Sequence, residues 1–234
     1  MGQKKLIRFE AIKSFPNVLQ YPEGMAGQWS QHFHNDHPIT LELACGKGEY
    51  TVGLAKLYPN RNFIGVDLKG NRIYIGAKKC LEEGVGNAAF LRTLIDKIPN
   101  YFRPGEVEEI WLTFPDPQLR RSRAKKRLTH PKFLRLYQQI LIPGGLIHLK
   151  TDSPVLYEFT RLVIELCGLP LLEASEDIHS GPMKEELRIS THYESLDIAR
   201  SNRVYYLCFA LPASPLPEVD EILYQKLKED ATAD

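Results

Sequence analysis

From residue 39 onward, short β-type apolar runs alternate with amphipathic segments, and this alternation constrains the fold more than any other feature of the chain. The β-type runs lie at residues 39–44, 62–68, 88–92, 109–114 and 146–150. Helical periodicity predicts helices at residues 49–57, 70–83 and 131–141, and a further helix that begins at Asp152-Ser153-Pro154 and closes at Gly168. Strands that alternate with helices form a parallel sheet covered on both faces, so we expect an α/β fold.

The two ends of the chain fit this alternation poorly. Residues 1–38 are rich in Gln, His, Pro and Gly and are expected to form a partly flexible N-terminal extension. Residues 212–234 are expected to form a charged C-terminal tail or short helix. Residues 39–211 then form the main domain, and its last run, at residues 203–211, predicts a late strand inserted antiparallel near an edge.

Charge and cysteine usage exclude several classes of protein. The chain has 30 Lys and Arg against 29 Asp and Glu, and 43% of its residues are hydrophobic, which is a globular rather than a disordered composition. No apolar run approaches the roughly 18 residues of a membrane-spanning helix, and the N-terminus lacks a secretory signal. The four cysteines are widely spaced without a C-x-x-C pair. We therefore expect a soluble, cytoplasmic protein.

The first predicted strand runs into a glycine loop with the sequence ELACGKG at residues 42–48. Thr51 stands where a dinucleotide fingerprint needs a third glycine, and the phosphate-loop pattern is absent. A ligand with an amino group and a ribose diol would use the carboxylates of Glu42 and Asp67 as acceptors, and S-adenosylmethionine has both groups. The arrangement resembles the class I methyltransferase nucleotide pocket. The alternative is a tight turn in which a buried Glu42 is satisfied by backbone amides.

A second loop follows the run at 109–114. Pro115 and Pro117 stiffen the backbone around Asp116, which predicts a fixed carboxylate at the carboxyl edge of the sheet. Six of the eight residues at 120–127 are cationic, and without them the net charge of the chain would fall from +1 to −5. Such a run is often only solvated surface. Beside a cofactor edge it could also neutralise the phosphates of a nucleic acid.

Five motifs together resemble the bacterial tRNA (guanine-N7)-methyltransferases. They are FPDP with its basic run ending KKR, the ELACGKG loop, NFIGVD, the strand ending Thr151-Asp152, and T-x-Y-E at residues 191–194. The resemblance covers about residues 38–210. It implies a Rossmann-like class I methyltransferase fold for residues 39–211, with a mostly parallel seven-stranded sheet, helices on both faces and an antiparallel late strand.

The resemblance also implies roles for individual residues. Asp116 would be catalytic and lie where cofactor and guanine meet. The family usually has a Gly-Asp pair whose acid contacts the adenine side of the cofactor, and Thr93 and Leu94 stand in its place here. The adenine contact is therefore assigned to the backbone at Leu94 or shifts to Asp96. The implied S-adenosylmethionine contacts are Glu42, Gly46, Gly48, Asp67, Leu94 and Asp116. The implied substrate contacts are Arg120, Ser122, Arg123, Ala124, Lys125, Lys126, Arg127, Asp152, Thr191, Tyr193 and Glu194.

The implied activity is methyl transfer from S-adenosylmethionine to N7 of a guanine in the variable loop of tRNA. Guanine N7 carries a free lone pair, so an in-line displacement needs no general base. Two alternatives stay open: a catalytically silent RNA-binding protein of the same fold, and a methyltransferase for another substrate.

We expect no metal, because His32, His34 and His37 match no zinc pattern and are explained by a polar loop. The sequence leaves monomer and homodimer open.

Overall fold

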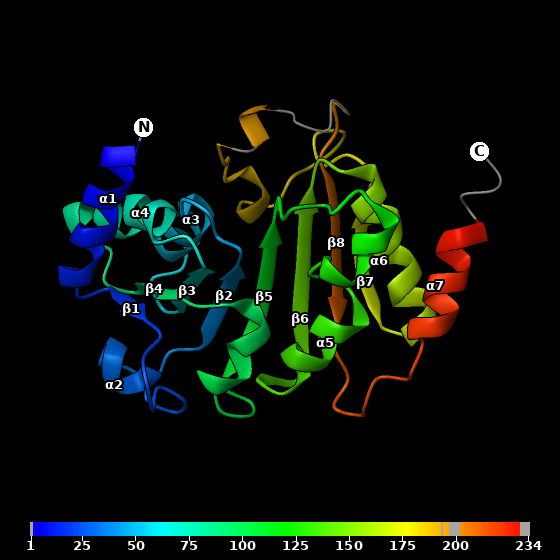
Figure 1. Ribbon diagram of the computed structural model, residues 1–234, viewed down its shortest axis with the longest axis horizontal. Helices are drawn as coiled ribbons and strands as arrows, with labels where there is room; N and C mark the ends of the chain where they lie inside the picture. Colours follow the sequence, from blue (N-terminus) through cyan, green and yellow to red (C-terminus); the bar gives the residue numbers. More distant parts are fainter. Residues whose placement is uncertain (1, 193, 197–201, 230–234) are drawn as a thin grey trace.

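The computed structural model describes residues 2–192, 194–196 and 202–229 and has one eight-stranded sheet between two layers of helices (Figure 1). The strands lie in the order β1 (Val18–Gln20), β4 (Ala88–Arg92), β3 (Asn62–Asp67), β2 (Ile39–Leu43), β5 (Val107–Thr113), β6 (Leu141–Thr151), β8 (Tyr205–Ala210) and β7 (Leu171–Ser175). Strand β8 is antiparallel to both of its neighbours, and every other pair in the sheet is parallel. The mostly parallel sheet with an antiparallel late strand is thereby confirmed.

The sheet has one strand more than expected, because the N-terminal region supplies β1. This strand pairs with β4, and α1 (Gly2–Ala11), the 3-10 helix η1 (Ile12–Ser14) and α2 (Trp29–Phe33) surround it in sequence. Trp29 is fully buried, stacks on Phe102 with 5.2 Å between ring centroids, and donates a hydrogen bond to the Tyr101 carbonyl at 2.9 Å. Residues 2–38 thus contribute to the sheet and to the core.

Alternate residues of each strand face opposite helical layers, as the two-residue period of a strand requires. On one face, Phe63 and Phe90 pack with α3 (Glu49–Leu57) and α4 (Gly70–Glu83). On the other face, Ile64 and Val66 belong to the core formed with α2, α5 (Pro131–Gln138), α6 (Pro154–Cys167) and α7 (Asp220–Glu229). Helix α6 begins with Ser153 accepting a hydrogen bond from the Leu156 amide, as its capping sequence predicts.

Between β7 and β8 the chain crosses the α3 side of the sheet as a segment that we call the strap, residues 176–192 and 194–196. Within these described residues, the only helices are the 3-10 turns η4 (Glu186–Arg188) and η5 (Glu194–Leu196). The arrows of β5 and β6 point to the edge where the strap lies, whereas that of β8 points away (Figure 1). Ile178 and Leu187 of the strap are buried in the same core cluster as Trp111 and Tyr206. The strap therefore covers the part of the sheet that α3 and α4 leave open.

Two further observations concern the chain as a whole. Cys45, Cys80, Cys167 and Cys208 are all buried free thiols. Within the residues that the structure describes, every helix is too short or too polar to span a bilayer.

Candidate active site

A cleft of about 620 Å³ opens at the carboxyl edge of the parallel strands. Its walls include Ala44 after β2, Asp67 at the end of β3, Phe114 and Asp116 after β5, and Asp152 after β6. Because parallel strands end at the same edge, residues far apart in the sequence meet there. The structure thus brings together three of the predicted carboxylates, those of Asp67, Asp116 and Asp152.

The loops around this cleft have an unusual backbone. Ala44, Phe114 and Gln118 adopt the left-handed conformation, with φ of 60°, 46° and 47°. For residues other than glycine this conformation costs on the order of 1 kcal/mol or more and persists only where the surroundings impose it. The loops after β2 and β5 are therefore held in shapes that their own sequences do not favour.

Asp116 is exposed on the cleft wall between Pro115 and Pro117. Its Oδ1 accepts a hydrogen bond from the Gln118 amide at 3.0 Å, which closes a short turn around the carboxylate. Two prolines and this turn fix where the charge lies. The predicted fixed carboxylate is present at the predicted edge.

Asp67 connects the glycine loop to the end of β3. Its Oδ2 accepts a hydrogen bond from the Gly46 amide at 3.0 Å, and its Oδ1 accepts one from the Lys69 amide at 2.7 Å. A carboxylate oxygen can accept a second hydrogen bond, so these contacts leave capacity for a ligand. Asp67 therefore both shapes the loop and lines the cleft.

Glu42 lies behind the glycine loop rather than on the cleft wall. Its Oε2 accepts hydrogen bonds from the amide and hydroxyl of Thr51, and its Oε1 accepts one from the hydroxyl of Thr113. Burial raises the pKa of Glu42 to about 7, although these hydrogen bonds oppose the shift. Glu42 is thus buried with one backbone amide and two threonine hydroxyls as donors. Glu42 ties the loop to α3 and β5.

The second glycine of the loop serves packing. A Cβ on Gly48 would collide with the Phe90 side chain of β4, and the φ of Gly48 is 70°. Both facts exclude a larger residue here without disturbance. The sequence assigned Gly48 to ligand approach, and the structure adds a contact with Phe90 of β4 that by itself requires a glycine.

The chain directly after β4 differs from the usual family pattern. Thr93 is buried and donates a hydrogen bond to the Tyr101 hydroxyl at 3.1 Å, while Leu94 is 46% exposed. Asp96 forms an ion pair with Lys132 of α5. Of the two options for the adenine side of the cofactor, Asp96 is thus already paired, and Leu94 presents an exposed apolar side chain.

The basic run forms the 3-10 helix η3 (Arg121–Lys126) and its flanks. The exposed members among the predicted contacts are Arg120, Ser122, Arg123, Lys125 and Lys126, whereas Ala124 is buried. Arg127 is only 2% exposed: its guanidinium lies over the Phe159 ring and donates to the Pro117 carbonyl at 3.1 Å and the Gln118 carbonyl at 3.3 Å. Arg127 therefore braces the Asp116 loop.

The T-x-Y-E motif lies on the strap. Thr191 is buried, and its Oγ1 accepts a hydrogen bond from the Glu194 amide at 3.2 Å. Glu194 in turn accepts a hydrogen bond from Lys150 Nζ at 2.9 Å. Tyr193 lies outside the described residues. Sequence reasoning missed Lys150, and the one signal for it was an ionisable residue that ends an apolar strand immediately before Thr151-Asp152.

A mostly parallel sheet with a late antiparallel strand, and a cleft beside the glycine loop that is lined by three aspartates together with Lys69 and Arg72, define a class I methyltransferase fold. Solved structures share it: the 16S rRNA methyltransferase KamB aligns with a TM-score of 0.62 at 16% identity, over 84% of this chain and 99% of that one. The 16S rRNA (adenine(1408)-N(1))-methyltransferase from Catenulisporales acidiphilia aligns with a TM-score of 0.57 at 15% identity, over 81% of this chain and 94% of that one. At these identities the likeness shows the fold alone.

Sequence relatives define the family. A family model described as "Putative methyltransferase" matches residues 36–207. The tRNA (guanine-N(7)-)-methyltransferase of Porphyromonas gingivalis is 48% identical over 86% of both chains. That of Bacteroides thetaiotaomicron is 46% identical over 91% of this chain and 87% of the relative. The chain belongs to the tRNA (guanine-N(7)-)-methyltransferase family, which confirms the resemblance seen in its motifs.

Proposed function

We propose that this protein transfers a methyl group from S-adenosylmethionine to N7 of a guanine in the variable loop of tRNA. The observation that carries the proposal is the cleft in which Asp67, Asp116 and Asp152 meet beside the exposed cations of η3. The names of the relatives support the substrate and the position methylated. The tRNA substrate and the four buried free thiols support a location in the cytoplasm.

The cleft fits the methyl donor by its chemistry. S-adenosylmethionine carries ribose hydroxyls and an ammonium group that donate hydrogen bonds, and when bound it supplies an electrophilic methyl group on a positively charged sulfur. Asp67, which already fixes the glycine loop, is the acceptor that we assign to the donor. Glu42 acts from behind the loop by holding it to Thr51 and Thr113.

Asp116 has an electrostatic role in this proposal. Guanine N7 needs no deprotonation, so the protein has to orient the acceptor and stabilise charge rather than move a proton. Orientation alone can contribute up to about 7 to 11 kcal/mol. Positive charge develops on the guanine ring during transfer, and the fixed carboxylate of Asp116 stabilises it. Losing one such group typically costs about a hundredfold or more in turnover.

The exposed cations of the basic run are assigned to the RNA backbone. Arg120, Arg123, Lys125 and Lys126 project from a segment that directly follows the Asp116 loop, and Leu119 beside them lines the cleft. Phosphates bound there would bring the acceptor base to the same edge of the sheet.

The test is transfer of label from S-adenosylmethionine to unmodified tRNA, followed by aniline cleavage to locate N7-methylguanine. Asp116→Ala should bind S-adenosylmethionine within about twofold of the wild type and lose about a hundredfold or more in turnover. Asp36→Ala, at an exposed loop before β2, is the matched control and should retain turnover. Label at another atom, or full activity of Asp116→Ala, would contradict the proposal.

A further inference from the structure

Lys150, the penultimate residue of β6, is fully buried, and its ammonium group is bound entirely by the strap. Its Nζ donates to the Leu187 carbonyl at 2.8 Å, the Ile189 carbonyl at 3.0 Å and Glu194 Oε2 at 2.9 Å. The three N–H donors of the ammonium group are thus matched by three acceptor oxygens. A buried cation costs desolvation that an apolar residue of similar length would not, so stability alone does not explain a lysine here.

The same residue also contacts the Asp116 loop. The Lys150 carbonyl accepts a hydrogen bond from the Phe114 amide at 2.8 Å, and Nζ lies 5.6 Å from the centroid of the Phe114 ring. The Tyr50 ring of α3 lies at a similar distance, 5.5 Å, from Nζ. Two residues further along the chain, Asp152 lines the cleft. Lys150 therefore joins the strap to the loop that carries the predicted catalytic carboxylate.

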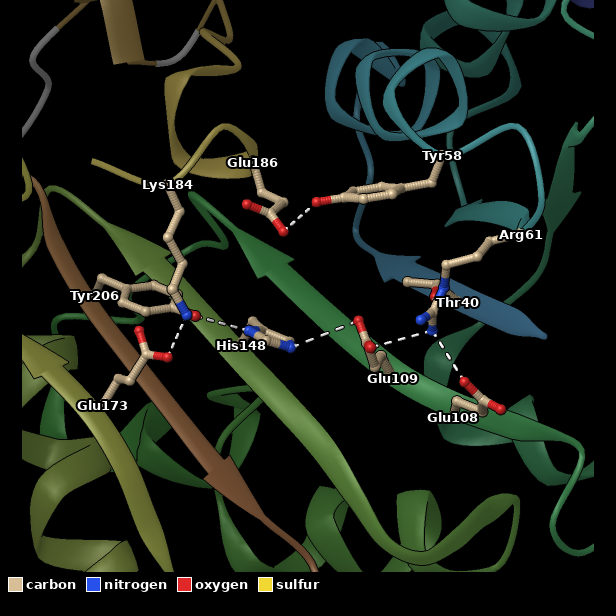
Figure 2. A network of polar contacts seen from close by, with 10 residues as sticks. All are labelled: Thr40, Tyr58, Arg61, Glu108, Glu109, His148, Glu173, Lys184, Glu186 and Tyr206. Carbon is tan, nitrogen blue, oxygen red and sulfur yellow. Dashed lines mark hydrogen bonds and ion pairs between the residues drawn. The ribbon is translucent and has the colours of Figure 1, made fainter. Parts of the chain in front are cut away.

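The strap also has contacts that do not involve Lys150: the Tyr50 hydroxyl of α3 donates to the Glu186 carbonyl at 2.6 Å, and the His192 amide donates to Glu49 Oε2 of α3 at 3.0 Å. Figure 2 shows Tyr58, the residue after α3, bonded to Glu186, Lys184 paired with Glu173, and the buried pair of His148 and Tyr206 nearby. These contacts hold the strap to α3 and β7 without Lys150. Loss of Lys150 should therefore loosen the strap at Leu187, Ile189 and Glu194, whose acceptors it binds, and leave the contacts with α3 and β7 in place.

We propose that Lys150 is a positioning residue that sets the T-x-Y-E end of the strap against the Asp116 loop, and thereby serves the tRNA rather than the methyl donor. The inference rests on the proposed function of the cleft. It assigns Glu194 a different role from the predicted direct contact with RNA: Glu194 acts through Lys150. Burial lowers the pKa of Lys150, and the Glu194 carboxylate opposes that shift.

The first test compares two lysine-to-methionine variants of the same assembly. Lys150→Met should lower kcat/KM for tRNA on the order of a hundredfold, the effect of a misplaced site, with S-adenosylmethionine affinity within about twofold by calorimetry. Lys184→Met removes the ion pair with Glu173 and is the matched control, expected to keep wild-type kinetics. Equal kinetics of the two variants, or an equal loss of donor and tRNA affinity in Lys150→Met, would overturn the proposal.

A double-mutant cycle tests the role of Glu194. Glu194→Gln should raise KM for tRNA, and Glu194→Gln combined with Lys150→Met should be no worse than Lys150→Met alone. Losses that multiply would show that Glu194 acts independently of Lys150. Since Glu194 is partly exposed, Glu194→Gln also keeps the test decisive if Lys150→Met does not fold.

Amide hydrogen exchange separates this inference from the proposed function, because it needs no tRNA. Exchange at residues 187–192 should accelerate in Lys150→Met and stay unchanged in Lys184→Met. Unchanged exchange in Lys150→Met would refute the anchoring even if the enzyme methylates tRNA. Faster exchange in Lys150→Met, together with a wild type that fails to methylate tRNA, would uphold the anchoring and count against the proposed function instead.

Discussion

Replacing Glu42 by Gln should change how the stability of the protein depends on pH. The carboxyl group of Glu42 is buried behind the glycine loop among Thr51 and Thr113. The amide of the replacement can keep this geometry, because its oxygen can accept from Thr51 and its nitrogen can donate to the Thr113 hydroxyl. The replacement removes the proton that the carboxyl group binds.

The size of the effect is set by the pKa. Burial raises the pKa of Glu42 from its ordinary value of 4.5 to about 7, so between these values the folded protein binds more protons than the unfolded chain. This bound proton stabilises the folded protein fully at pH values below the pKa of Glu42 in the unfolded chain. The stabilisation is lost as the pH rises through the pKa of Glu42 in the folded protein. Because one pKa unit corresponds to about 1.4 kcal/mol, the unfolding free energy should fall by about 3 kcal/mol over this range.

The assay is urea unfolding of the wild type and of Glu42→Gln at several pH values between about 5 and about 8. The informative quantity is the difference between the two proteins. His148, whose pKa burial lowers to about 3, has the opposite effect on stability as pH rises, but it is present in both and cancels. The difference should decrease by about 3 kcal/mol from the acidic to the basic limit. Parallel profiles would refute the argument that Glu42 is protonated in the folded state at acidic pH.

The remaining predictions concern the basic run. Replacing Arg123, Lys125 and Lys126 by Ala should weaken tRNA binding and reduce the slope of log affinity against log salt by about two to three, since each phosphate contact contributes about 0.7 to 0.9. An unchanged slope would mean that these cations are only solvated surface. Arg127→Met should leave that slope unchanged but lower turnover, because its guanidinium holds two carbonyls of the Asp116 loop rather than RNA. A reduced slope in Arg127→Met would show that the arginine reaches phosphate.

The periodic part of the fold could be predicted from the sequence, and the short strands could not. The run at residues 62–68 and the capped helix after Asp152 carry their own signals, and β3 and α6 formed there. Strand β1 has three residues in a region rich in Pro and Gly, and only its pairing with β4 makes it a strand. Strand β7 has an exposed, irregular pattern without a clean alternation. Whether a short segment becomes a strand depends on its pairing with a neighbouring strand, which the sequence of the segment itself does not determine.

The meeting of Asp67, Asp116 and Asp152 could be predicted because parallel strands place their carboxyl ends at one edge. The contacts that each residue makes there could not be predicted. Glu42 and Gly48 stand at the expected positions, yet one faces two threonines and the other faces Phe90. A residue's place along a strand is fixed by a pattern of period two, whereas its partner depends on distances between elements far apart in the chain.

Arg127 and Lys150 are buried cations whose partners no sequence pattern indicates. Each donates to two backbone carbonyls of a connecting segment, the Asp116 loop for Arg127 and the strap for Lys150. In such segments the carbonyls lack the regular backbone hydrogen bonds of a helix or sheet. A long cationic side chain can donate these hydrogen bonds instead, but burying its charge costs desolvation free energy. A methionine in either place avoids that desolvation but leaves the carbonyls to water. For both methionine variants, turnover should therefore fall by more than the change in stability would explain. Measuring kcat and the free energy of unfolding in the same variants tests this expectation.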